Sequence, residues 1–216
     1  MMENTKYNYL HFVRFSNLVN WSVSHLLGIN MGFTHRFPMV TIGSVIERCK
    51  TMIDIDDSTQ YKQITLKTNG GGAVLRDVKF GKDIGTKKQY VVSSGQFIMS
   101  KIDARNGAFG IVSEDLTGAV VTGDFPVFDV DKERLNSSYL QLLSSTKPFI
   151  RFAQGCSRGT TNRPRIDVKQ FLDMQIPLPY LEEQNAIVAD YKDSILMAKQ
   201  YEQRAAKINK ALPINA

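Results

Sequence analysis

Apolar and polar residues alternate over several short stretches in the first two thirds of the chain, which is typical of β-strands with one buried face. Turn-forming residues separate these stretches, as at residues 69–72 and 93–95. The predicted strands cover residues 39–43, 61–67, 89–92, 96–102, 108–112, 119–122 and 125–130. Because proline has no N–H to donate, we expect Pro126 to place the last strand at a sheet edge or a bend.

Helical spacing is rarer in this part of the chain. Residues 44–46 indicate a short helix after the first strand, and residues 135–144 a longer one, with caps at 136–138 and its end at Pro148. Within residues 1–36, Ser16 or Asn17 is predicted to cap a short helix of unclear role. Many short strands with few helices predict the α+β class, with a largely antiparallel or mixed sheet.

Residues 166–184 separate this body, residues 37–180, from a different C-terminal segment. Pro177 and Pro179 lack N–H groups and restrict the residues before them, so residues 176–179 should be extended. Glu182 and Glu183 follow in what should be the first turn of a helix, where negative charge is favourable. Neither proline nor glycine then occurs until Pro213, so residues 181–212 are predicted to form one long helix within the segment 181–216.

The long helix has an apolar stripe close to the spacing of a coiled coil. The stripe consists of Leu181, Val188, Tyr191, Ile195, Ala198, Tyr201, Ala205, Ile208 and Leu212. A helix this long with one apolar face usually needs a partner helix, and no earlier segment predicts one of matching length. We therefore expect pairing with a second chain; the alternative is a helix that folds back over its own body.

The net charge of +6 is concentrated in residues 1–180. Residues 181–212 contain five acids and five bases and are neutral (Glu182, Glu183, Asp190, Asp193, Glu202; Lys192, Lys199, Arg204, Lys207, Lys210). Residues 147–170 hold six bases against Asp167 alone. Such a basic segment indicates either a polyanion partner or a solvated surface loop.

The chain shows neither a signal peptide nor an apolar run long enough to span a membrane. Cys49 and Cys156 lie far apart and match no metal or redox spacing, so we expect two free thiols. These features predict a soluble cytoplasmic protein.

Two groups of residues are candidates for nucleic-acid contacts. In the first, Lys101 ends a predicted strand, and Arg105 and Asn106 lie in a tight turn before the next. Arginine matches the two major-groove acceptors of guanine, and asparagine can pair with adenine. The alternative is a structural hairpin turn in which Asn-Gly supplies positive φ and Arg105 pairs with Asp103.

The second group is a loop of small residues, hydroxyls and arginines at 155–165. Backbone N–H groups, hydroxyls and arginines are the groups that hold phosphates and fix the register of a protein on a duplex. The candidate phosphate contacts are Ser157, Arg158, Thr160, Thr161, Arg163 and Arg165.

Catalytic motifs are absent from the sequence. There is no phosphate-binding GxxxxGK[ST] loop and no GxSxG elbow, and His11, His25 and His35 have no metal-site spacing. Asp103 and Asp124 are the candidates for a nuclease, but no Glu-x-Lys follows them. We therefore expect a non-catalytic chain with no cofactor and no metal.

An ordered set of motifs resembles the specificity subunits of type I restriction–modification systems. The motifs are SKIDARNGAFGIV at 100–112, VVTGDFPVF at 120–128, GTTNRPRI at 159–166, F-x4-IPLP at 171–179 and LEEQ at 181–184. The resemblance implies that residues 37–180 form a target recognition domain that reads one half of a split DNA sequence. It also implies that the long helix is a spacer on which DNA adenine methyltransferase subunits, and where present a restriction–translocase subunit, assemble.

The usual subunit of that family carries two recognition domains and two spacer helices, whereas this chain has one of each. As a half-subunit, it would pair with a second copy through residues 181–212 and read an interrupted palindrome. The alternatives are a truncated fragment, or the recognition part of a fused single-chain restriction–methyltransferase enzyme. A general RNA- or DNA-binding adaptor is a further alternative.

Overall fold

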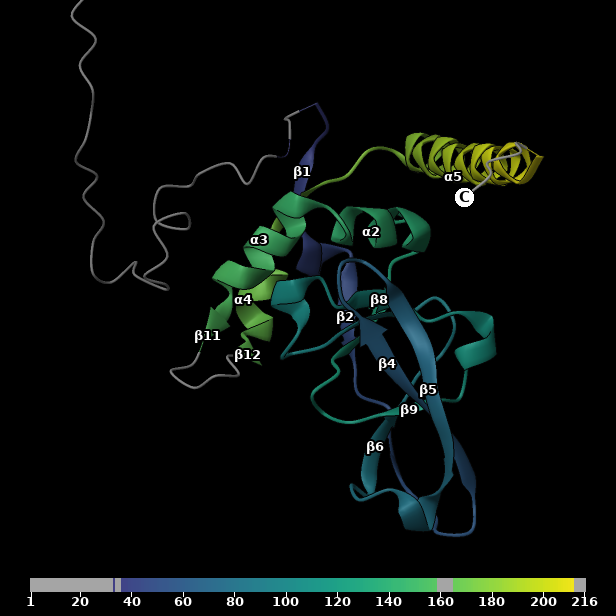
Figure 1. Ribbon diagram of the computed structural model, residues 1–216. Coiled ribbons are helices and arrows are strands. Elements are labelled where there is room, and N and C mark those ends of the chain that lie inside the picture. The colour runs from purple at the N-terminus through teal and green to yellow at the C-terminus, as the bar shows by residue number, and fades with distance from the viewer. Residues whose placement is uncertain (1–32, 34–35, 159–164, 212–216) are drawn as a thin grey trace, which may run out of the picture.

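Two β-sheets and a group of short helices form the body of the protein in the computed structural model, which describes residue 33, residues 36–158 and residues 165–211 (Figure 1). The strands are β1 (Met39–Thr41), β2 (Ile46–Cys49), β3 (Met52–Asp54), β4 (Gln60–Lys67), β5 (Gly72–Phe80), β6 (Lys88–Val91), β7 (Phe97–Met99), β8 (Phe109–Ile111), β9 (Val120–Val121), β10 (Val127–Val130), β11 (Ser157–Arg158), β12 (Arg165–Ile166) and β13 (Gln175–Pro177). The helices are α2 (Ser137–Ser144), α3 (Lys147–Gly155), α4 (Val168–Leu172) and α5 (Leu181–Ala211), with 3-10 turns η2 (Ile42–Ser44), η3 (Gly81–Asp83), η4 (Ala104–Asn106) and η5 (Glu114–Leu116). The helix predicted within residues 1–36 lies outside the described residues.

The larger sheets have the strand orders β2-β10-β7-β8 and β3-β6-β9-β4-β5. Among the described strands every pairing is antiparallel except the contact between β4 and β9. The α+β class with a mixed, largely antiparallel sheet is therefore confirmed.

Neighbouring residues of β7 and β10 face two different cores, one shared with the helices and one shared with the other sheet. Phe97 and Phe128 pack in the core shared with the helices, whereas Ile98 and Val127 pack in a second core together with residues of the five-stranded sheet. Successive strand residues point to opposite faces, so the four-stranded sheet forms the middle layer.

Five fully buried phenylalanines form the centre of the helical core: Phe97, Phe109, Phe128, Phe149 and Phe171. They come from β7, β8, β10, α3 and α4, and the Phe171 ring lies 5.9–6.5 Å from the other four ring centres. Aromatic side chains bury large apolar areas, so this cluster ties α3 and α4 to the sheet.

The structure differs from the sequence predictions in several places. Residues 42–44 form a 3-10 turn and Ile46 already begins a strand, where a helix over 44–46 was expected. Of the two alternatives for Pro126, the sheet edge is wrong, because β10 is an inner strand that begins one residue later and so keeps its backbone donors, whereas the chain does bend at Phe125. Pro148 lies in the first turn of α3, where a missing N–H costs nothing, and does not end the preceding helix. The strand β5 was not predicted, because Arg76 and Asp77 interrupt its alternation.

The prediction of an extended segment after α4 is confirmed. The strand β13 pairs with β1, and the Leu178 amide donates to the Pro38 carbonyl at 2.8 Å. The Tyr139 hydroxyl donates to the Pro177 carbonyl at 3.0 Å. Burial, with a contribution from the Glu183 carboxylate, raises the pKa of Tyr139 to about 12, so this phenol stays a donor.

Gln184 joins α5 to the body. Its side chain is fully buried; its Oε1 accepts from the Asn136 amide, and its Nε2 donates to the carbonyls of Arg134 and Pro179, each at 2.8 Å. Asn136 is also the N-cap of α2, where its side chain accepts from the Ser138 and Tyr139 amides. One glutamine therefore connects α5, the extended segment and the start of α2.

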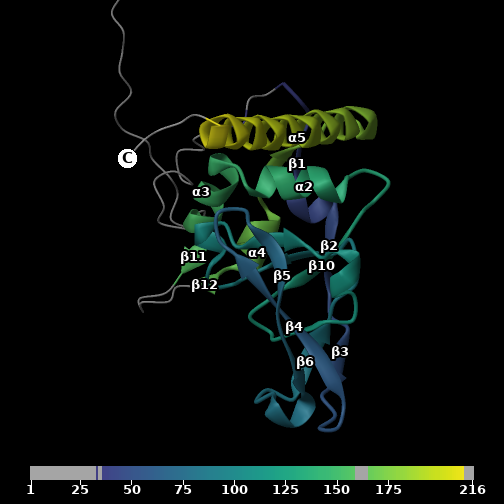
Figure 2. The ribbon, with the colours of Figure 1, turned by 45° about the vertical axis from the view of Figure 1, so that its right-hand side comes forward.

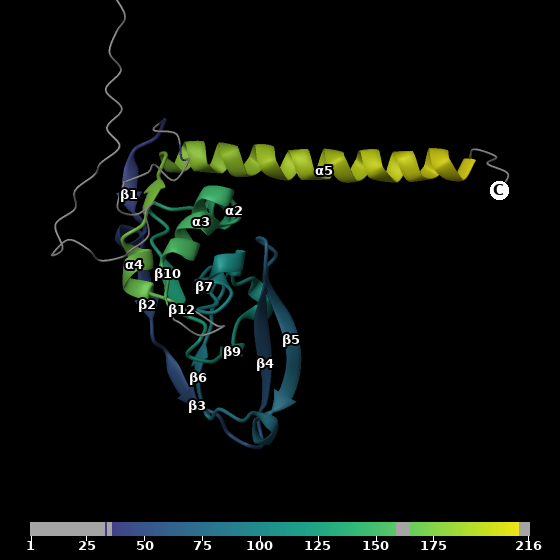
Figure 3. The same ribbon diagram turned by 60° about the vertical axis from the view of Figure 1, so that its left-hand side comes forward.

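Beyond this junction α5 leaves the body. It lies along α2 in Figure 2 and extends well past the sheets in Figure 3, at about 1.5 Å per residue for roughly 46 Å. Leu181 and Val188 are at least half-buried, but every residue from 189 to 210 is exposed. Leu212 lies outside the described residues. Within the part of the chain that the structure describes, no helix is sufficiently long and apolar to cross a membrane.

Candidate nucleic-acid interface

Three segments that are distant in sequence meet at the end of the four-stranded sheet. The Lys101 amide donates to the Asp124 carbonyl, and the Ile166 amide donates to the Lys101 carbonyl, both at 2.8 Å. The residues after β7, the turn before β10 and the strand β12 are therefore linked through their backbones. This arrangement brings Lys101 of the first candidate group next to the strand that carries Arg165 of the second.

The described members of the second group, Ser157, Arg158 and Arg165, belong to the small antiparallel pair of β11 and β12, below α3 and α4 in Figure 1. In this hairpin Arg158 and Arg165 are directly opposite each other. The Arg165 guanidinium is more than half exposed and donates to the Asp124 carboxylate at 3.0 Å. A monodentate pair leaves most of the five arginine donors available to a ligand. Thr160, Thr161, Arg163 and the Arg158 side chain lie outside the described residues.

The hydroxyl of Ser157, a predicted phosphate contact, is engaged in a hydrogen bond within the protein. Its hydroxyl donates to the Ala153 carbonyl at 2.9 Å, where α3 ends. A phosphate needs donors, so Ser157 in this conformation is better placed to fasten β11 to α3 than to hold a phosphate.

Arg105 and Asn106 of the first group lie in η4, a 3-10 turn and not the tip of a simple hairpin, and Lys101 precedes it. Gly107 ends the turn with φ of +77°, a conformation that favours glycine. The Gln154 amide donates to the Arg105 carbonyl at 2.9 Å, which holds the turn against α3. Among the described residues Arg105 forms no ion pair with Asp103, contrary to the structural alternative.

The exposure of these residues suits contact with a ligand. Lys101 and Arg105 are half-buried and Asn106 is exposed, and η4 holds the last two next to each other. On α3 and α4, the bases Lys147, Arg151 and Lys169 are exposed. Within the described residues none of these three forms an ion pair. The described body thus carries exposed cations on α3 and α4 and donors on η4, which are the groups that backbone contact with a polyanion requires.

A nuclease centre receives no support from this geometry. The Asp124 carboxylate, one of the two carboxylates considered for it, is paired with Arg165. The described residues contain no group of three metal-ligating side chains.

We expect Asp124→Asn to remove the ion pair that orients the Arg165 side chain. The protein should stay folded, because an exposed ion pair contributes at most about 1 kcal/mol to the free energy of folding. Removing a negative charge beside the candidate DNA-contacting cations should raise affinity for random-sequence duplexes at low salt. Fluorescence-anisotropy titrations of one duplex over a salt series measure this, with Asp83→Asn as a control of equal charge change. Equal affinity of wild type and Asp124→Asn at every salt concentration would argue against Asp124 and Arg165 lying at the interface.

An α+β body with exposed cations is typical of a DNA-binding domain. In this chain the body is followed by a long exposed helix. The family model for the type I restriction modification DNA specificity domain matches residues 37–203. The chain therefore belongs to this family.

Solved structures agree with this assignment at the level of the fold. The HsdS subunit from Thermoanaerobacter tengcongensis superimposes with a TM-score of 0.65 and 21% identity, over 81% of this chain and 46% of that chain. A chain from a study of complex assembly and conformational transition of the type I R-M system gives a TM-score of 0.62 and 22% identity, over 82% and 48% of the two chains. The protein thus spans about half the length of the structures it matches. No curated protein sequence matches it.

Proposed function

We propose that this protein is the sequence-reading specificity subunit of a type I restriction–modification complex. The body, residues 37–180, acts as a target recognition domain for one half of a bipartite site in double-stranded DNA. The observation that carries this proposal is the meeting of the Lys101 segment, η4 and the β11–β12 hairpin on one donor-rich surface. The chain itself has no catalytic role, and the methyltransferase subunits supply the chemistry.

The segment 181–216 serves as a spacer and pairing helix in this proposal. The exposed residues of α5 after Val188 include Tyr191, Ile195, Tyr201 and Ile208, which are 41–70% exposed. Exposed large apolar side chains in a row usually mark an interaction site. Two copies joined through α5 would restore the two recognition domains of a full-length subunit, and methyltransferase subunits would dock on the paired helices. A two-fold pair would read an interrupted palindrome.

The test is genome-wide detection of methylated adenine in host cells with and without the gene. Deletion is expected to abolish methylation at one split motif and leave every other motif intact. A palindromic motif would support two copies per complex, whereas an asymmetric motif would require a second, different recognition domain. An unchanged pattern of methylation contradicts the proposal.

A further inference from the structure

The hairpin of β4 and β5 ends in a tight turn at Thr68 to Gly71. Asn69 and Gly70 have φ of +56° and +74°, and the Gly71 amide donates to the Thr68 carbonyl at 3.2 Å. Positive φ at both central residues defines a type I′ turn, for which Asn-Gly is the preferred pair. Asn69 therefore has a backbone reason to be at this position, and any further role of its side chain needs a separate argument.

This turn is fastened to η4 by its backbone. The Asn69 amide donates to the Asn106 carbonyl at 2.8 Å, and the Gly70 amide donates to the Gly107 carbonyl at 3.1 Å. Gly70 also lies so close to Ser145, after α2, that a Cβ would come within 2.5 Å of the Ser145 side chain. The tip of the hairpin and the Arg105–Asn106 turn are thus one rigid unit, although Asn69 and Arg105 are 36 positions apart in the sequence.

An open groove of about 340 Å³ lies between these two turns and α3. It is lined by Thr68, Asn69, Arg105, Asn106, Ile150 and Gln154. Among the described residues, the side chains of Asn69, Arg105 and Asn106 form no hydrogen bond or ion pair, while Gln154 is engaged in holding Arg105. Two amides and one guanidinium therefore line a single open groove with their donors and acceptors available.

We propose that this groove reads base edges in the major groove of DNA and that Asn69 is a specificity-determining residue, together with Arg105 and Asn106. The amide of asparagine matches the N6 and N7 atoms of adenine, and arginine matches O6 and N7 of guanine. The major groove admits a two-stranded ribbon, which is the shape of the β4–β5 tip. The inference rests on the proposed function and adds to it a reading element, the β4–β5 turn, that the sequence did not indicate.

The variant Asn69→Gly distinguishes the role of the Asn69 side chain from its role in the backbone of the turn. Glycine adopts positive φ as readily as negative, so the turn and its two bonds to η4 remain while the amide is lost. The experiment selects duplexes with randomised positions by binding to the full chain and sequences the bound fraction. Arg105→Ala is the comparison, and Lys82→Ala, in η3 at the opposite end of β5, is the control.

We expect Asn69→Gly to lower the preference at one or two base positions by about ten-fold or more, next to the positions that Arg105→Ala relaxes. The dependence of binding on salt should stay unchanged, since no charge is lost. Lys82→Ala should retain the wild-type preference at every position.

The outcomes separate this inference from the proposed function. If the wild type selects no sequence, the proposed function fails. If the wild type selects a sequence and Asn69→Gly keeps every preference while Arg105→Ala relaxes some, Asn69 is only a turn residue and the inference fails. Equal loss of binding to all duplexes for Asn69→Gly would also overturn it.

Discussion

Replacing Gln184 by leucine is expected to lower the free energy of unfolding by several kcal/mol and to loosen α5 from the body. The change removes the hydrogen bonds of the Asn136 amide and of the carbonyls of Arg134 and Pro179, of which the bond to Pro179 is buried and the other two are partly buried. Each buried polar group left without a partner costs about 1–3 kcal/mol. Urea denaturation measures the stability, and hydrogen exchange at the start of α2 and α5 measures the local loosening.

Gln200→Leu is the matched control, because Gln200 has the same side chain on the exposed part of the same helix. A surface substitution of this kind should change stability by no more than about 0.5 kcal/mol. If both variants unfold at the same urea concentration, Gln184 does not secure the junction. If Gln184→Leu lowers the stability without faster hydrogen exchange at α5, Gln184 stabilises the body and not the attachment of α5.

The second large effect concerns assembly. At tens of micromolar we expect light scattering to give twice the 24.3 kDa mass of the chain, and the double variant Ile195→Gln, Tyr201→Gln to give the mass of one chain. Ile195 and Tyr201 are 41% and 70% exposed on a helix that has left the body. Burial of such side chains in a partner is worth roughly 1.5–3 kcal/mol each, and glutamine keeps the helix propensity.

Asp193→Ala, on the opposite side of α5 from Ile195, serves as the control and should remain paired. The body of the double variant should be unaffected, since the buried Gln184 and Val188, which join α5 to the body, precede the changed positions. A wild-type chain that has the mass of one copy would exclude pairing through α5 and leave only the DNA-reading part of the proposal.

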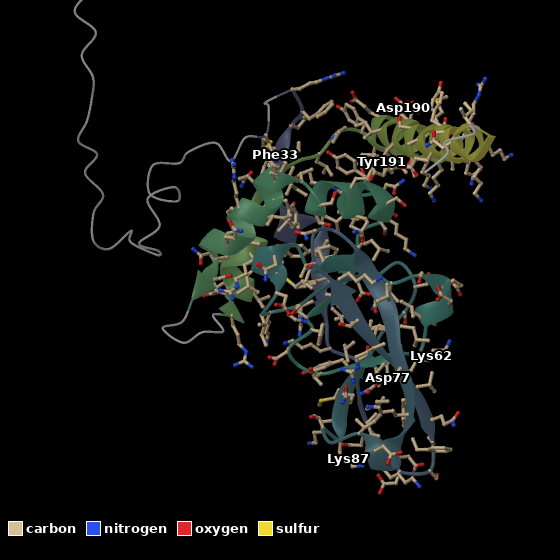
Figure 4. All side chains as sticks on the ribbon, viewed as in Figure 1. Phe33, Lys62, Asp77, Lys87, Asp190 and Tyr191 are labelled. Atoms are coloured by element: carbon tan, nitrogen blue, oxygen red, sulfur yellow. The ribbon has the colours of Figure 1, made fainter. Side chains whose placement is uncertain are left out.

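The body extends away from α5. In Figure 4 the labelled Lys87, just before β6, lies at the end of the body far from α5, which carries Asp190 and Tyr191. Gln184 is one of several contacts that hold the start of α5 against the body, together with the buried Val188 and the partly buried Ile187. If two copies pair as proposed, the angle between α5 and the body would set the distance between the two half-sites.

Local chemistry in the sequence was sufficient for most of the secondary structure. Alternation predicted β4, β6, β7 and β8, and Asn136 was predicted among the caps of α2, because strand faces and helix caps depend on neighbouring residues. The prolines of residues 176–179 predicted an extended segment, since their effect on φ is intrinsic to the residue. The long helix followed from the absence of glycine and proline. Pro148 was an exception, because proline occurs both after the end of a helix and in the first turn of a helix such as α3.

Contacts between distant residues were decided by the tertiary structure alone. The pairing of β4 with β5 and the docking of their turn on η4 bring Asn69 to Arg105, and a backbone ladder brings Arg165 to Asp124. Gln184 had the appearance of a polar helix residue, yet it is fully buried, because its amide is satisfied by the backbone of Pro179 and of the distant Asn136 and Arg134. Periodicity indicates which face of an element is buried, but it contains no information on which element covers that face. The sequence by itself thus determined most of the elements and the candidate residues for DNA contact, and packing decided which of them meet.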